Sequence, residues 1–144
     1  MIMIIAGGKK NSGWVAEAIA EYEKRLKKPY DLHWRFMEEE KLAKYLLDWP
    51  FSGREYVVLL DERGENMSSP EFSRKMADAF NTSKEIVLII GGAFGVTEEV
   101  RKRSDLVLSF SKLVFPHMLA RVMVVEQVYR GQEIWRNSKY HHGD

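Results

Sequence analysis

A glycine-rich turn lies between an apolar run and a segment with helical spacing in the second half of the chain. It reads Gly91-Gly92-Ala93-Phe94-Gly95 and directly follows the apolar run 86–90. Glycines allow the backbone to approach a ligand closely and to present its N–H groups. The spacing matches neither the dinucleotide-binding pattern nor a P-loop. Taken alone, the turn is compatible with a ligand site or with a strand-to-helix turn that needs a positive φ.

Two further polar turns follow apolar runs in the same way. Asp61-Glu62-Arg63-Gly64 comes after the run 56–60, and the segment 109–117 comes at the end of the run 106–110. Asp61 could orient a ligand, although capping the turn is the commoner role for such a residue. Ligands bind at the carboxyl ends of strands in open α/β sheets. Three turns at one sheet edge therefore favour a ligand site more strongly than any one of them.

The last segment with helical spacing, at about 117–136, is apolar over a wide arc but carries two arginines. A charge on such a helix needs a partner or a ligand. Glu126 lies four residues before Arg130, so these two are expected to pair. For Arg121 a structural pairing and a functional role are equally open. His117, at the start of the helix, is more typical of a structural group than of a catalyst.

The chain after this helix is basic and aromatic. Its cationic and aromatic residues are Arg136, Lys139, Tyr140, His141 and His142. Such tails are usually solvated, but cations combined with stacking side chains are a usual means of binding RNA. A metal site is not expected, because adjacent histidines rarely reach one ion together. The basic run 24–28 is expected to be a solvated helix face rather than an RNA contact.

Alternating strands and helices must position these residues. Five apolar runs are expected to form strands, at 2–6, 32–37, 56–60, 86–90 and 106–110. Most are rich in Ile, Val and Leu, as in strands buried on both faces, whereas 32–37 alternates and predicts a half-exposed edge strand. Segments 14–28, 38–49, 70–81, 96–104 and 117–136 have helical spacing, with Ser69 as the expected N-cap of the third. The alternation predicts a single α/β domain over residues 1–144, with a mostly parallel sheet and flanking helices.

Composition limits the class of protein. The chain has 144 residues, 22 basic and 21 acidic side chains, and a formal net charge of +1. This balance argues against a protein that holds nucleic acid by overall charge. The lack of cysteine excludes disulfides and cysteine nucleophiles. With no signal-like leader and no long apolar run, a cytoplasmic location without membrane attachment is expected. The small core favours association with a second subunit.

The ordered motifs of the chain resemble the RlmH family, the ribosomal large-subunit pseudouridine N3-methyltransferases of the SPOUT superfamily. Each motif alone is weak, whereas the set, in order and at near-family spacing over nearly the whole chain, is specific. The motifs are Ala20-Glu21-Tyr22-Glu23-Lys24-Arg25-Leu26, Leu60-Asp61-Glu62-Arg63-Gly64, Ser68-Ser69-Pro70-Glu71-Phe72, Ile90-Gly91-Gly92-Ala93-Phe94-Gly95, Ser109-Phe110-Ser111-Lys112-Leu113-Val114-Phe115-Pro116-His117, Glu126-Gln127-Val128-Tyr129-Arg130 and Tyr140-His141.

This resemblance implies a fold and a reaction. The fold would be the α/β knot, with a C-terminal trefoil knot, in a homodimer whose active site spans the interface. S-adenosylmethionine would lie among the three turns, and its methyl group would pass to N3 of pseudouridine 1915 in the 23S rRNA of the ribosome. The cofactor-binding positions carried over by matching residues are Leu60, Gly91, Phe110, Ser111, Lys112, Leu113, Val114 and Phe115.

Catalysis would need help at the N3 nitrogen, because N3 carries an imide proton and is a poor nucleophile until that proton leaves. Alignment of the reactants would supply much of the acceleration. A cation near the uracil carbonyls would stabilise the developing imide anion, and Arg121 is the candidate. A neutral imidazole suits proton transfer at pH 7, which makes His141 the candidate base. Tyr140, beside it, is the third candidate catalytic residue.

The chain departs from the family pattern in several places. Val114 stands where the family usually has Thr, Gly131 where it has Ala, the segment 37–55 is shorter, and the tail ends in His142-Gly143-Asp144. These differences bear more on the tail than on the cofactor site. A rival from another class is a non-catalytic ribosome- or RNA-binding module that retains the fold, against which the intact turns argue. A small nucleotide-binding α/β protein is a third alternative, and it lacks a phosphate motif.

Overall fold

A five-stranded sheet forms the centre of the computed structural model, which describes residues 1–49, 51–92 and 96–142. Its order across the sheet is β2-β1-β4-β3-β5, and each pair of neighbouring strands is parallel. The predicted α/β fold with a parallel sheet is therefore confirmed. The strands are β1 (Ile2–Gly7), β2 (Leu32–Met37), β3 (Glu55–Glu65), β4 (Glu85–Ile90) and β5 (Leu106–Leu108).

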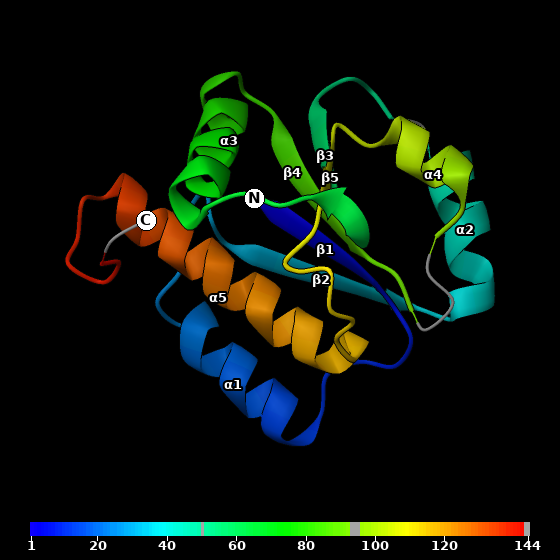
Figure 1. Ribbon diagram of the computed structural model, residues 1–144, viewed down its shortest axis with the longest axis horizontal. Coiled ribbons are helices and arrows are strands. Elements are labelled where there is room, and N and C mark those ends of the chain that lie inside the picture. The colour runs from blue at the N-terminus through cyan, green and yellow to red at the C-terminus, as the bar shows by residue number, and fades with distance from the viewer. Residues whose placement is uncertain (50, 93–95, 143–144) are drawn as a thin grey trace.

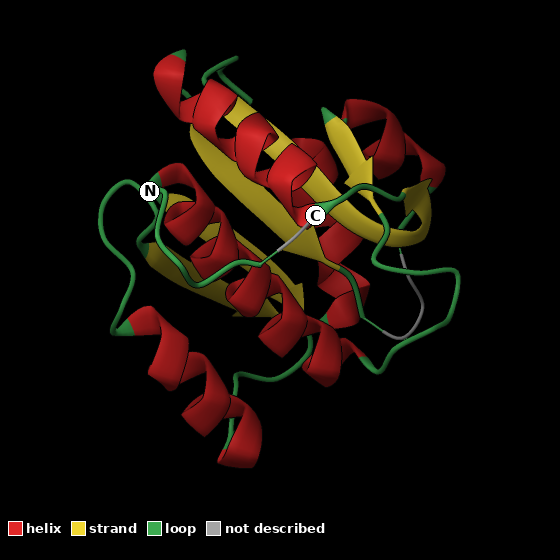
Figure 2. Cartoon of the chain, turned by 60° about the vertical axis from the view of Figure 1, so that its left-hand side comes forward, coloured by secondary structure: helices red, strands yellow, loops and turns green. Residues whose placement is uncertain are grey.

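Helices cover both faces of the sheet (Figure 1), and Figure 2 shows the strands between the two layers of helices. On one face, α5 (His117–Trp135) lies between α1 (Gly13–Glu23) and α3 (Ser69–Asn81) and packs against both. On the other face, α2 (Glu39–Asp48) contacts α4 (Glu98–Arg103). Among the helices of the described residues, none is long and apolar enough to cross a bilayer.

The central strands are apolar on both sides because each side packs against helices. Ile4 and Leu88 belong to one buried cluster, together with Val125 of α5. Ile5 points to the other side, into a second cluster that contains Leu42 of α2. Removing such a side chain from water stabilises the fold by roughly 1.5–3 kcal/mol. The near-continuous apolar runs of the sequence are thus explained by a sheet buried on both faces.

Strand β2 lies at an edge of the sheet, as its alternating sequence predicts. His33 and Arg35 are exposed, whereas Trp34 and Phe36 are partly buried and pack against the core. The exposed His33 has a local partner, because its Nε2 atom lies 2.9 Å from Oδ2 of Asp31. This histidine therefore belongs to the solvated side of an edge strand.

Several element ends differ from the sequence prediction; α4, for example, begins at Glu98 rather than at residue 96, and β5 ends at Leu108 rather than at residue 110. α1 ends at Glu23 rather than at residue 28, because the next amides bond three residues back: Arg25 N donates to Tyr22 O, and Leu26 N donates to Glu23 O. This tighter turn still directs Leu26 toward the core. The apolar residues therefore keep a helix-like spacing in the sequence after the α-helix itself has ended.

The N-cap of α3 is Ser68 rather than the predicted Ser69. The Ser68 hydroxyl accepts a hydrogen bond from the backbone N of Glu71 at 3.2 Å and donates one to the Glu71 carboxylate at 3.1 Å. Ser69 is then inside the helix, where its hydroxyl donates to Oε1 of Gln127 at 2.7 Å. The cap is therefore one residue earlier than predicted, at the serine whose hydroxyl reaches the amide of Glu71.

Candidate active site

A pocket of about 770 Å³ opens at the carboxyl ends of β3, β4 and β5. The three polar turns meet in its wall, which confirms that they share one edge of the sheet. Pockets for small ligands typically measure about 300–1,000 Å³. The lining residues used below are Leu60, Asp61, Ile90, Gly91, Gly92, Phe110, Leu113, Val114, His117 and Ala120.

The cofactor-binding positions implied by the family resemblance line this pocket, with one exception. Lys112 is exposed and is absent from the described lining residues. Leu113 and Val114 are 71% and 73% exposed although both are large and apolar. They offer an apolar surface at the mouth of the pocket. The rest of the glycine-rich turn, residues 93–95, lies outside the described residues.

The end of β3 crosses the end of β5 at close range. The backbone N of buried Ser109 donates to the carbonyl of Glu65 at 3.0 Å, and Asn66 Nδ2 donates to the Ser109 carbonyl at 2.8 Å. Gly64 permits the crossing, because a Cβ there would lie 2.5 Å from the carbonyl oxygen of Val107. The crossing extends β3 to Glu65, beyond its predicted end at residue 60, and it fixes one wall of the pocket.

The ends of β1 and β4 converge beside the pocket at the start of α2. A Cβ on Gly7 would lie 3.1 Å from the backbone N of Gly92, and a Cβ on Gly92 would overlap the carboxyl group of Glu39. Glycine at both positions lets these backbones come together without displacing the side chains of Glu39 and Leu42. The loop after β1 is therefore a neighbour of the glycine-rich turn.

Asp61 holds a fixed negative charge in the pocket wall. Burial alone would raise the pKa of Asp61, but hydrogen bonds from the side chain and backbone of Arg63, with the charges of Arg63 and Arg101, bring it below its ordinary value. Nη2 of Arg63 lies 3.2 Å and Nη2 of Arg101 3.0 Å from its carboxylate. The predicted capping role is confirmed, since Arg63 N donates to Oδ1 of Asp61 at 2.9 Å.

Arg121 lies behind the pocket rather than in its described wall, although His117 and Ala120 line it. Its side chain has no exposed surface. The guanidinium donates to the carbonyl oxygens of Gly7 and Lys9, at 3.0 and 2.7 Å, in the loop after β1. Burial lowers the pKa of Arg121. The partner that this helix charge requires is therefore supplied by the protein itself.

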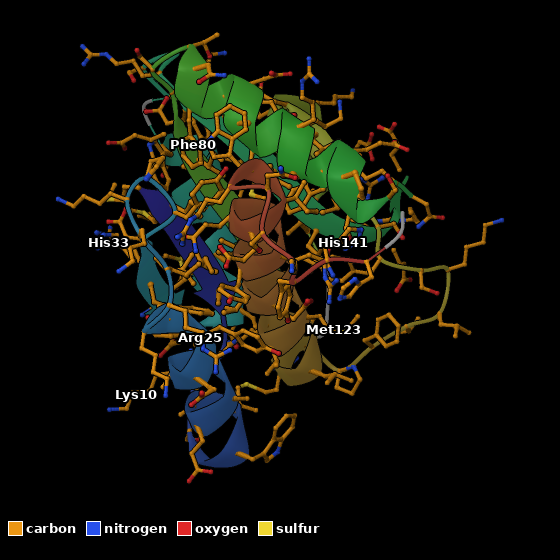
Figure 3. The ribbon with its side chains drawn as sticks, turned by 90° about the vertical axis from the view of Figure 1, so that its left-hand side faces the viewer. Lys10, Arg25, His33, Phe80, Met123 and His141 are labelled. Carbon is orange, nitrogen blue, oxygen red and sulfur yellow. The ribbon has the colours of Figure 1, made fainter. Side chains whose placement is uncertain are left out.

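The C-terminal tail folds back along α5, and Figure 3 shows His141 beside this helix. Arg130 Nη1 lies 2.9 Å from Nδ1 of His141, and Arg130 pairs with Glu126 at 2.7 Å as their spacing predicts. The Tyr140 ring packs edge-on against Tyr129, with centroids 4.7 Å apart. Neither candidate tail residue is in the described wall of the pocket. The tail contact lies about 20 Å along α5 from the helix start, at 1.5 Å per residue.

Both candidate tail residues carry protons in this arrangement. Arginine can only donate, so Nδ1 of His141 accepts and the proton of the neutral ring is on Nε2. Burial, with the nearby charges of Glu126 and Tyr22, raises the pKa of Tyr140 to about 12. At neutral pH Tyr140 is therefore a phenol that can donate a hydrogen bond but cannot take up a proton. The last residues, Gly143 and Asp144, lie outside the described residues.

Sequence reasoning missed the loop after β1. A signal was present, because Gly7-Gly8-Lys9-Lys10 follows an apolar run just as the other three turns do. In a parallel sheet, a fourth such turn belongs at the same edge. Asp61 and His117 also line the pocket, although neither was among the site residues expected from the resemblance.

The fold and the pocket define a class of protein. The profile of the family described as "Predicted SPOUT methyltransferase" matches residues 1–141. The chain belongs to this family and is a methyltransferase.

Curated relatives of the chain carry a more specific name than the family does. The chain is 38% identical to "Ribosomal RNA large subunit methyltransferase H" of Caldicellulosiruptor bescii, over 98% of this chain and 99% of that one. It is 37% identical to the protein of that name from Desulfitobacterium hafniense (strain Y51), over 97% and 98% of the two chains. The resemblance found in the motifs is thereby confirmed.

A solved structure agrees with the fold. A probable methylase family protein from Haemophilus influenzae has a TM-score of 0.58 and 13% identity, over 99% of this chain and 70% of that one. At this identity the likeness concerns the fold alone.

Proposed function

We propose that the protein methylates N3 of a pseudouridine in large-subunit rRNA, with S-adenosylmethionine as the methyl donor. The observation that carries this proposal is the pocket at the carboxyl ends of β3, β4 and β5, where the three turns of the family motifs meet. The names of the relatives support large-subunit rRNA as the substrate, and the family resemblance implies that the RNA is methylated within the ribosome. Position 1915 of 23S rRNA follows from the family resemblance.

The pocket suits the methyl donor in size and character. Its volume of about 770 Å³ lies within the usual range for small-molecule sites. Leu60, Ile90 and Phe110 give it apolar surface for a heterocyclic ring, and Gly91 leaves the backbone open to close approach. These residues, with 111–115, would hold S-adenosylmethionine, which supplies an electrophilic methyl group when bound.

Proton removal from N3 is assigned to His141. In the docked tail its Nδ1 atom is occupied by the hydrogen bond from Arg130, so this atom can accept a proton only after the tail leaves α5. The freed imidazole then takes the N3 proton on Nδ1 and becomes a cation. Tyr140, which keeps its own proton, would donate a hydrogen bond to a uracil carbonyl oxygen.

A homodimer would bring the tail and the pocket together. The tail contact at Arg130 is about 15 Å along α5 from Ala120 in the pocket of its own chain, so the pocket of a second copy is the natural place for Tyr140 and His141 to act. Exposed apolar side chains support such an association. They include Trp14 at the start of α1, Leu119 on α5, and Leu113 and Val114 at the pocket mouth.

Titration calorimetry with S-adenosylmethionine tests the cofactor site. The wild-type protein should bind, and Gly91→Val should abolish binding because a branched side chain blocks the approach to the backbone. Ala20→Val is the control, because it adds a branched side chain at an exposed position of α1, outside the described wall of the pocket. If the wild-type protein showed no binding at millimolar cofactor, the proposal would fail.

Single-turnover methylation tests the proton acceptor. We expect His141→Ala to slow methyl transfer to ribosomal RNA while cofactor binding stays unchanged. His33→Ala, which removes an exposed imidazole from the edge strand, should leave the rate as it is. Full transfer by His141→Ala would remove His141 from the role of base.

A further inference from the structure

We propose that Arg121 is a positioning residue that holds the loop after β1, residues 7–11, so that Lys9 and Lys10 bind phosphates of the RNA strand beside the target base. The inference rests on the proposed function and extends it to the contact between the enzyme and its RNA. It replaces the direct stabilisation of an imide anion that the sequence suggested for Arg121.

The guanidinium of Arg121 spans the loop from end to end. Nη2 donates to the carbonyl of Gly7 at 3.0 Å, and Nη1 donates to the carbonyl of Lys9 at 2.7 Å and to Oδ1 of Asn11 at 3.0 Å. A planar guanidinium presents its donors in a fixed fork, so several bonds to one loop fix the conformation of that loop.

The surroundings of Arg121 exclude it from direct contact with a substrate in this arrangement. Its side chain is fully buried, and its guanidinium carbon lies 5.3 Å from the centroid of the Phe36 ring. Nε is also buried and has no hydrogen-bond partner among the described residues. Burying this charge is costly unless it is bonded. The hydrogen bonds of the guanidinium all go to the loop after β1. We therefore infer that Arg121 fixes the position of this loop.

The held loop adjoins the pocket. Gly8 has a φ of +108°, in the region that favours glycine, and a Cβ there would lie 3.5 Å from Arg121 Nη2 and 3.7 Å from Nε2 of His117. His117 lines the pocket. Strand β1 is the direct neighbour of β4, and Figure 1 shows the loop after β1 passing beside the start of α5. The loop therefore lies beside the pocket on the β1 side of the same sheet edge.

The loop displays two cations to solvent. Lys9 and Lys10 are both exposed, and Figure 3 shows Lys10 on the outside of the molecule. Lysine side chains bind backbone phosphates, which position a nucleic acid without reading its sequence. Because the net charge is only +1, overall charge cannot hold the RNA, and the protein needs lysines where the RNA strand lies. A loop fixed next to the pocket is such a place, because the RNA strand must extend beyond the base that enters the pocket.

The salt dependence of RNA affinity tests this assignment. The probe is 23S rRNA from cells that lack the protein, and the readout is the slope of the logarithm of the association constant against the logarithm of salt concentration. Loss of two phosphate contacts in Lys9→Ala/Lys10→Ala should reduce that slope by roughly 1.4–1.8. The matched control is Lys27→Ala/Lys28→Ala, which removes the same charge from exposed lysines after the opposite end of α1.

Removal of the Arg121 guanidinium, and with it the hydrogen bonds to the loop, tests the positioning role. Arg121→Met should reduce the slope as much as the double lysine variant does, although Arg121 itself is buried. Asn11→Ala, which removes one acceptor of the fork, is the milder variant and decides the matter where Arg121→Met does not fold. In the Lys9→Ala/Lys10→Ala background, neither change should reduce the slope further, whereas S-adenosylmethionine affinity should persist in every variant.

The outcomes separate this inference from the proposed function. Equal slopes for the wild type and Lys9→Ala/Lys10→Ala would overturn it, as would equal losses from both lysine pairs. A further loss from Asn11→Ala in the double lysine background would show that the loop acts without its lysines, and would overturn it too. The affinity measurement needs no methyl transfer. A wild-type protein that binds RNA in the expected manner but transfers no methyl group would contradict the proposed function alone.

Discussion

Nη1 of Arg130 donates a hydrogen bond to Nδ1 of His141 over 2.9 Å, and this contact ties the C-terminal tail to the C-terminal half of α5. It exists only while His141 is neutral, because an imidazolium has a proton on both ring nitrogens. The nitrogen that would serve as the base is therefore occupied while the tail is docked. Docking and proton acceptance are alternative states of His141.

The first prediction concerns the release of this tail. Arg130→Gln should undock it, because the charged hydrogen bond to His141 and the ion pair with Glu126 are both lost. Loss of about 1–2 kcal/mol should increase the open population about 5–30-fold. The rate of tryptic cleavage after Lys139, followed by mass spectrometry, measures that population. Arg74→Gln, at an exposed pair on α3, is the control. Unchanged cleavage in Arg130→Gln would contradict the docking contact.

The second prediction concerns the crossing of the two chain segments at the pocket wall. Gly64→Ala should lower the free energy of unfolding by about 1–3 kcal/mol, because the new Cβ meets the backbone of Val107 and cannot be accommodated by a rotamer change. Urea denaturation measures the change. Val107→Ala should not rescue it, since the backbone atoms remain at 2.5 and 2.7 Å. Wild-type stability of Gly64→Ala would mean that the segments do not cross so closely.

The third prediction concerns the contact between α3 and α5. The Ser73 hydroxyl donates to the carbonyl of Gly131 at 2.8 Å, and a Cβ on Gly131 would overlap Cε of Met76. Alanine favours a helix over glycine by about 1 kcal/mol, but here the gain is offset by displacement of Met76. Gly131→Ala should therefore stabilise the protein more in a Met76→Leu background than alone. Thermal unfolding of the four proteins checks this, and strict additivity would contradict it.

The fourth prediction concerns stability in alkaline solution. Burial raises the pKa of Tyr30 from an ordinary value of 10.0 to about 12. Between these values the unfolded chain loses a proton that the folded protein keeps, so the free energy of unfolding falls as pH rises through this window. Tyr30→Phe should remove that part of the fall. The Tyr30 hydroxyl has no hydrogen-bond partner among the described residues, so the change should not destabilise the protein at pH 7.

Denaturation of wild type and variant at a series of pH values measures this difference. Tyr45→Phe is the control, because it leaves Tyr30 in place and should keep the fall. Equal pH profiles for wild type and Tyr30→Phe would contradict the burial effect.

The sequence carried the information for the sheet and for the edge that bears the pocket. Runs such as 86–90 are apolar at every position because both faces of β4 are covered, and the turns after parallel strands share an edge by topology. The pairing of Glu126 with Arg130 followed from helical spacing, which depends only on neighbours along the chain.

Contacts between distant segments could not be predicted in this way. The crossing of Gly64 over Val107 and the bonds from Arg121 to the loop after β1 join residues that no local spacing relates. The sequence therefore left a structural pairing and a functional role for Arg121 equally open, and the structure gives it the carbonyl oxygens of the first loop as partners. Likewise, nothing in the composition of the tail indicated that His141 lies against Arg130.

The central claim is that this pocket supports methyl transfer to a pseudouridine of large-subunit rRNA. Mass spectrometry of 23S rRNA from cells with and without the protein tests it most directly. The account predicts that N3-methylpseudouridine disappears when the protein is absent, returns with the wild-type protein and does not return with Gly91→Val. The same methylated nucleoside in both RNAs, at equal levels, would contradict it.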